Sequence, residues 1–168
     1  MTVNSSSASH TSVRDSQAPV SAGASASFVW SDARLLGFGP MDHTHEEFYR
    51  VTFDLLTCTF AGASDALHAF ESHAVEHFEQ ENEWMEKSLF PARDCHIAEH
   101  AAVLLSVREV GEGFTSGALG LDTVHDLAME LFSWFPGHAD YLDSALAAWM
   151  TRRNMGGTPV VMRRSLRA

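Results

Sequence analysis

Histidines and carboxylates recur at helical spacing on stretches whose other inward positions are apolar, and this pattern constrains the fold more than any other feature. The 168 residues include ten histidines. His77 and Glu81 are four residues apart, as are His96 and His100, so each pair lies one turn apart on one face of a helix. Burying such groups is costly unless each has a strong partner. A metal centre in the core of a helix bundle would serve all of them.

Four stretches show the periodicity of three and four residues between apolar side chains that indicates helices. They cover about residues 41–61, 65–89, 93–110 and 121–150, with breaks at 62–64, at Phe90-Pro91 and in the glycine-rich stretch 111–120. Pro136 predicts a kink in the fourth helix, because it lacks a backbone N–H. Short connections between four helices predict an all-α fold, an antiparallel up-down-up-down four-helix bundle.

The two ends of the chain are expected to lie outside this bundle. Residues 1–27 are dominated by Ser and Ala and contain no aromatic residue, which predicts a disordered tail. Residues 28–151 hold the bundle, and residues 152–168 form a basic C-terminal tail.

Composition excludes several classes of function. The chain has 22 Asp and Glu against 11 Lys and Arg, so we expect no nucleic-acid partner. It has no run of about 18 apolar residues, so we expect no membrane partner. Two cysteines do not form a disulfide framework, and residues 1–27 lack the pattern of a secretory signal. We therefore expect a cytoplasmic protein.

Further polar groups fall on the inward faces of the predicted helices. His45 lies on the inward face of the first helix and His138 on that of the fourth. In an α-helix a step of five residues places Asp143 about 140° around from His138, which would let this carboxylate reach a second ion. Any one of these histidines, taken alone, could also be an ordinary core residue. A single pair of histidines one turn apart could also bind zinc. Five imidazoles and two carboxylates exceed the need of one tetrahedral zinc and suit two iron ions.

The remaining histidines are assigned by their angular position on the helices. His43, His68 and His125 are expected at the surface, and His10 falls in the N-terminal tail. His73 lies one turn before His77 on the same face, so we expect it to line the bundle above the metals.

Four motifs resemble those of the hemerythrin family, and specifically the single-domain bacterial hemerythrins. They are Asp42-x-x-His45, His77-Phe78-x-x-Glu81 followed by Met85, His96-x-x-x-His100, and Trp134-x-x-x-His138-x-x-x-x-Asp143. The resemblance runs from Trp30 to about Trp149 and implies a non-heme di-iron centre in the bundle core, with an oxo or hydroxo bridge and O2 as ligand. Glu-x-x-His motifs, which are typical of carboxylate-rich di-iron oxidases, are absent from the sequence.

The resemblance also implies a role for each site residue. His96, His100 and His138 would coordinate one iron, His45 and His77 the other, and Glu81 and Asp143 would bridge the two. The O2 pocket would be lined by Phe48, Phe78, Trp134, Phe135, Ala139 and Leu142. Ala139 departs from the family, which commonly has a bulkier Ile there, and this favours a more open pocket.

These features predict reversible O2 binding for transport, storage or delivery, with no catalytic residue and therefore no enzyme. Two alternatives stay open. One is a di-iron redox enzyme, a peroxidase or a nitric-oxide-processing protein, which the open pocket at Ala139 would favour. The other is an O2-responsive sensor module. O2 is the expected partner, and the sequence does not identify a protein partner.

Overall fold

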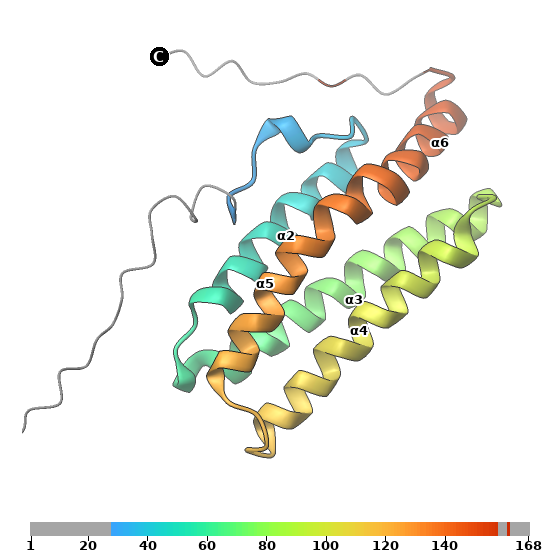
Figure 1. The fold of residues 1–168 in the computed structure, drawn as a ribbon. Helices are drawn as coiled ribbons and strands as arrows, with labels where there is room; N and C mark the ends of the chain where they lie inside the picture. The colour runs from blue at the N-terminus through green and yellow to red at the C-terminus, as the bar shows by residue number, and fades with distance from the viewer. Residues whose placement is uncertain (1–27, 158–160, 162–168) are drawn as a thin grey trace, which may run out of the picture.

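The computed structural model describes residues 28–157 and 161, and over these residues every regular element is helical. The four long helical arms are α2 (Gly39–Thr57), α3 (Ala63–Ser88), α4 (Arg93–Thr115) and α5 (Leu121–His138), and α5 continues through the π-helical turn η4 (Ala139–Asp143) into α6 (Ser144–Met155). Helix α2 packs against α3 and α5, and α4 packs against the same two helices (Figure 1). The predicted all-α four-helix bundle is confirmed.

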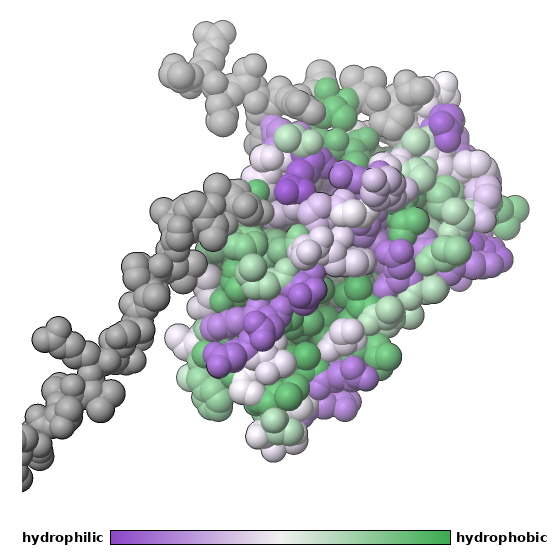
Figure 2. All heavy atoms as spheres, viewed as in Figure 1, coloured by the Kyte–Doolittle hydropathy of each residue, from purple (hydrophilic) through white to green (hydrophobic). Residues whose placement is uncertain are grey.

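The two tails fall largely outside this description. Residues 1–27 and most of 158–168 lie outside the described residues, so the disordered and basic tails stay predictions. Within the described part, every helix is too short or too polar to cross a membrane. On the face shown in Figure 2, hydrophobic residues lie interspersed with hydrophilic ones.

The predicted ends of the first and third helices were wrong. Helix α2 ends at Thr57 instead of near residue 61, because Cys58 is extended and the 3-10 turn η3 (Phe60–Gly62) follows. Helix α4 continues past the predicted end near residue 110 to Thr115, so the break before α5 occupies the second half of the predicted stretch 111–120. A Cβ at Gly113 would come too close to the side chain of Leu119, so a larger residue in that last turn would require this side chain to move.

The fourth arm changes its helical register between the two site residues that it carries. Helix α5 passes through Pro136 without ending, and the register changes in η4, where the N–H of Ser144 donates to the carbonyl of Ala139, five residues earlier. This π-helical hydrogen bond adds one residue to the turn. Residues five apart therefore face the same side, so His138 and Asp143 are better aligned than α-helical geometry predicts.

Helix α3 ends in a left-handed turn at Leu89, whose φ is 56°. The N–H of Leu89 donates to the carbonyl of Glu86 (3.2 Å), and the N–H of Phe90 donates to the carbonyl of Met85 (2.9 Å). These two bonds form a Schellman motif, in which the hydrophobic contact is between buried Phe90 and Met85. The side chain of Leu89 is 72% exposed, so packing does not compensate for its strained backbone.

A short N-terminal segment packs across the outer face of α2. It includes the 3-10 turn η2 (Asp32–Arg34), and the ring of Trp30 lies 5.7 Å from that of Tyr49. The buried carboxylate of Asp42 accepts hydrogen bonds from the N–H groups of Leu36 (2.6 Å) and Gly37 (3.0 Å). Asp42 therefore fixes this segment to the first turn of α2.

The core consists of two apolar clusters with a polar layer between them. The larger cluster includes Phe48, Phe70, Phe78 and Phe135, and the smaller includes Met41, Met85 and Leu146. On α2, His45 lies between Met41 and Phe48. The same order holds on the fourth arm, where His138 and Asp143 lie between Phe135 and Leu146. The buried polar groups therefore form one layer across the bundle.

Candidate metal centre

All the residues predicted as metal ligands converge in this layer. Each is buried, with at most 3% of its surface exposed, and they come from four helical arms. They are His45 on α2, His77 and Glu81 on α3, His96 and His100 on α4, His138 on α5 and Asp143 on η4.

The imidazoles divide into a group of three and a group of two. The Nε2 atom of His138 lies 3.1 Å from that of His96 and 3.2 Å from that of His100. The second group consists of His45 and His77, whose ring centroids are 5.3 Å apart. One group therefore offers three nitrogen donors to a single point, and the other offers two.

Glu81 turns one carboxylate oxygen toward each group. Its Oε1 lies 3.2 Å from Nε2 of His77 and 3.9 Å from Nε2 of His45. Its Oε2 lies 3.4 Å from Nε2 of both His96 and His100.

Asp143 has the same divided arrangement. Its Oδ2 lies 3.2 Å from Nε2 of His45, and its Oδ1 lies 3.0 Å from Nε2 of His96 and 3.2 Å from Nε2 of His138. Two carboxylates that each face both groups have the arrangement needed to bridge two metal ions.

The hydrogen bonding of the layer fits a metal better than a closed polar network. Nε2 of His45, Oε2 of Glu81 and both carboxylate oxygens of Asp143 are buried and form no hydrogen bond with any described residue. Each such atom costs about 1–3 kcal/mol when left unsatisfied. The separations of 3.0–3.4 Å between donor atoms also match the edge of an octahedron with metal–ligand distances of about 2.1 Å, which is roughly 3.0 Å. The residues present therefore fit a pair of metal ions.

In the metal-free layer, a protonated imidazole balances part of the negative charge of the buried carboxylates. Burial raises the pKa of Glu81, but the surrounding histidines, His77 first, outweigh burial and bring it well below the usual range. Burial opposes the charge of His96, yet the carboxylates of Asp143 and Glu81 beside it raise its pKa to about 9. Burial lowers the pKa of His100 to about 4. A metal ion would replace the proton on His96, because only a neutral imidazole binds metal.

Two groups that the sequence analysis missed orient the ligand histidines. Nδ1 of His138 lies 3.1 Å from Oε2 of Glu99, and Nδ1 of His100 lies 3.1 Å from Oδ1 of Asn82. When Nδ1 donates to such a partner, Nε2 keeps its lone pair for a metal. Glu99 and Asn82 each neighbour a ligand in sequence, but nothing else in the chain marks them.

The aromatic residues predicted to line the pocket surround both groups of histidines. Phe48 and Phe135 stack with centroids 4.1 Å apart, and Phe135 lies 4.9 Å from the ring of His45. Phe78 stacks on His100 at 4.0 Å, and Trp134 lies 4.3 Å from His138.

The two aliphatic residues of the predicted pocket both lie on η4. Ala139 is buried, and Leu142 is half-buried. Their role in an O2 pocket stays a prediction.

The remaining histidines mostly follow the prediction. His43 and His68 are exposed, whereas His10 lies outside the described residues. His125 is only half-buried, and its Nε2 lies 3.0 Å from the carbonyl oxygen of Cys58, so the prediction of a free surface position was wrong. His73 is half-buried one turn before His77, with ring centroids 5.7 Å apart.

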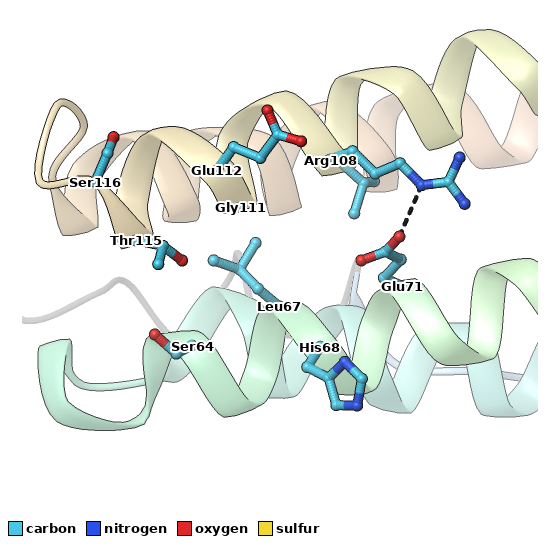
Figure 3. Close-up of a pocket in the computed structure, with 10 residues that line it drawn as sticks. Ser64, Leu67, His68, Glu71, Arg108, Gly111, Glu112, Thr115 and Ser116 are labelled. Carbon is cyan, nitrogen blue, oxygen red and sulfur yellow. Dashed lines mark hydrogen bonds and ion pairs between the residues drawn. The ribbon is translucent and has the colours of Figure 1, made fainter.

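A separate groove of about 560 Å³ lies between α3 and α4 (Figure 3). It is lined mainly by polar side chains such as His68, Ser64 and Thr115. Its carboxylate at Glu71 accepts a hydrogen bond from Nε of Arg108 at 2.7 Å. The residues that line it do not include any of the buried histidines or carboxylates of the layer, so it is distinct from the centre.

Comparison with known proteins agrees with the geometry. The chain is 36% identical over 124 residues to a bacteriohemerythrin of Ralstonia nicotianae, and this match covers 74% of the chain and 89% of the relative. The chain matches no family model and no solved structure. Since the match extends over nearly all of the relative and the buried histidines and carboxylates converge in the core of a four-helix bundle, the chain belongs to the bacterial hemerythrin family.

Proposed function

We propose that this protein binds O2 reversibly at a di-iron centre, and that it serves O2 transport, storage or delivery. The observation that carries the proposal is the divided arrangement of Glu81 and Asp143, each of which turns one oxygen toward the three-histidine group and the other toward the two-histidine group. Two bound iron ions would supply two electrons and a coordination position for O2.

The unequal histidine groups suggest where O2 binds. His96, His100 and His138, with one oxygen from each carboxylate, would give one ion five protein donors. His45 and His77, with the other two oxygens, would give the second ion four. The free position would therefore lie at the end of the centre formed by His45 and His77.

The donor set favours iron(II). Five neutral imidazoles and two carboxylates carry less negative charge than the carboxylate-rich sets of di-iron oxidases. With two divalent ions and a hydroxide bridge, this donor set would leave the centre with a net positive charge, which would favour the reduced state and disfavour high-valent iron. Such a centre suits reversible binding better than oxygenation of a substrate.

The residues around His45 keep water away. Phe48 and Phe135 are each at most 1% exposed and stack against one another beside this histidine. Apolar side chains around the site slow the entry of protons, and they therefore slow the loss of bound O2 as peroxide. The chain thus protects the reversibility of binding by excluding water.

The test is the iron content per chain, with the absorption spectrum of the reduced protein before and after air is admitted. We expect two irons and an O2-dependent band that disappears when O2 is removed. His77→Ala should abolish this band and keep most of the helix content, whereas His68→Ala, at an exposed position on the same helix, should leave the band intact. A band that survives in His77→Ala would contradict the site assignment.

A second candidate is a di-iron redox enzyme of the peroxidase or nitric-oxide-processing kind. The observation that favours it is Ala139, a small buried residue directly after His138. Two irons that pass directly to a ferric spectrum in air, with catalytic consumption of peroxide, would support the enzyme. A sensor role would require a change in partner binding or oligomeric state that depends on O2, and a cytoplasmic location stays a prediction.

A further inference from the structure

His73 occupies the layer directly above the two-histidine end of the centre. On α3, His73 lies four residues before His77. Likewise, Phe135 lies three residues before His138 on α5, and Phe48 lies three residues after His45 on the antiparallel α2. The ring centroid of His73 is 5.7 Å from that of His77 and 6.3 Å from that of Phe48. His73 thus places a polar side chain beside the stacked rings that cover this end.

The imidazole of His73 has an unused buried nitrogen. The side chain is only 11% exposed, and its Nδ1 lies 4.0 Å from Oε2 of Glu47, which is too long for a hydrogen bond. Nε2 is buried and forms no hydrogen bond with any residue that the structure describes. Burial lowers the pKa of His73 to about 4, so the ring is neutral near pH 7.

Ordinary explanations for a buried histidine do not fit His73. His125, which is also partly buried, places its Nε2 3.0 Å from a backbone carbonyl oxygen, as a histidine in a structural role does. A role as metal ligand is not supported either, because the clusters of donor atoms within 4.8 Å of one another among the described residues do not include His73. A buried polar atom without a partner is destabilising, and it indicates a partner that the protein chain does not supply.

We propose that Nε2 of His73 donates a hydrogen bond to a small ligand held at the His45–His77 end of the centre. This inference rests on the proposed function and adds selectivity to it. Phe48 and Phe135 offer only apolar contact, so one imidazole N–H beside them would favour ligands with a hydrogen-bond acceptor at the free end. Small linear anions belong to this class, as does O2 once it has taken up electrons. His73 would therefore act as a ligand-stabilising residue and not as a metal ligand.

Azide binding to the ferric protein tests the hydrogen bond directly. His73→Leu removes the donor and keeps an apolar side chain of similar size, so azide should bind roughly 10- to 100-fold more weakly. His73→Gln places an amide near the position of Nε2 and should bind azide within a few-fold of the original protein. His68→Leu, on the same helix at an exposed position, is the matched control and should bind azide unchanged. Equal azide affinity in His73→Leu and the original protein would overturn the proposal, and so would His73→Gln binding as weakly as His73→Leu.

The melting temperature of the metal-free protein gives an independent readout. If Nε2 of His73 lacks a partner within the chain, His73→Leu should raise the melting temperature by a few degrees. A lower melting temperature would mean that the imidazole stabilises the fold, and the proposal would be wrong. If the protein holds two irons but does not bind O2 reversibly, the proposed function fails, while the azide comparison still decides the role of His73.

Discussion

Removing the carboxylate of Glu99 should weaken metal binding although Glu99 is not itself a ligand. Its Oε2 lies 3.1 Å from Nδ1 of His138 and accepts a hydrogen bond from the Nδ1–H, which keeps Nε2 of this histidine free for metal. In Glu99→Ala the imidazole of His138 loses this orientation and part of its donor strength. The three-histidine group should therefore hold its ion less tightly.

The expected size of the effect follows from the exposure of Glu99. Outer partners of ligand histidines are typically worth about 10- to 100-fold in metal affinity. The side chain of Glu99 is 49% exposed, so water competes for the hydrogen bond and screens the charge. We therefore expect the low end of the range, roughly tenfold or about 1.4 kcal/mol.

Anaerobic competition for iron(II) with a chromophoric chelator measures this affinity. Glu99 and Glu130 both line a groove between α4 and α5. Glu130→Ala is therefore the matched control, because this substitution removes the same charge but no hydrogen bond to a predicted ligand histidine. If Glu99→Ala and Glu130→Ala retain iron equally well, any change in iron affinity comes from the loss of one negative charge near the centre, and the assigned role of Glu99 is wrong.

Three further predictions concern the turn after α3, the protonation of the layer and the size of the pocket. Leu89→Gly should stabilise the metal-free protein by about 1 kcal/mol in urea unfolding, because glycine adopts a positive φ without strain; a loss of stability would mean that the exposed leucine has a packing role. The folded-state pKa of His96 is raised to about 9 from an ordinary 6.5, so its contribution to metal-free stability is complete below pH 6.5 and disappears as pH rises through 9. The melting temperature of the metal-free protein should accordingly fall between these pH values, and a flat profile would refute the assignment. Ala139→Ile should lengthen the lifetime of the O2 complex, measured by the decay of its absorption band in air, because a bulkier side chain at this buried position narrows the pocket; an unchanged or shorter lifetime would reject the open-pocket interpretation.

The buried cluster of histidines and carboxylates could be predicted because its signal is local. Imidazoles and carboxylates on apolar helix faces, such as His77 and Glu81 one turn apart, identify both the inward face and the chemistry on it. The four arms followed from the same periodicity. The partner histidines then had to meet in the core, since four antiparallel helices bury one face each.

The features that the sequence did not reveal depend on contacts between distant residues. The predicted end of the third helix near residue 110 was too early, and the sequence does not show that Gly113, inside the helix, lies against the side chain of Leu119. Glu99 and Asn82 contact His138 and His100 on other helices, and a Glu or Asn at such a position is ordinary on a helix surface. Local sequence patterns do not record which side chain from another helix lies opposite.

The π-helical turn makes the length of the fourth arm as important to the centre as its residue types. One residue fewer between His138 and Asp143 would restore α-helical hydrogen bonding and shift everything after the turn by one position, or about 100° of rotation. The whole of α6, with Leu146 and its apolar cluster, would have to rotate with the carboxylate. The centre should therefore tolerate substitutions between His138 and Asp143 better than insertions or deletions, because only a change in length alters the orientation of Asp143 relative to His138.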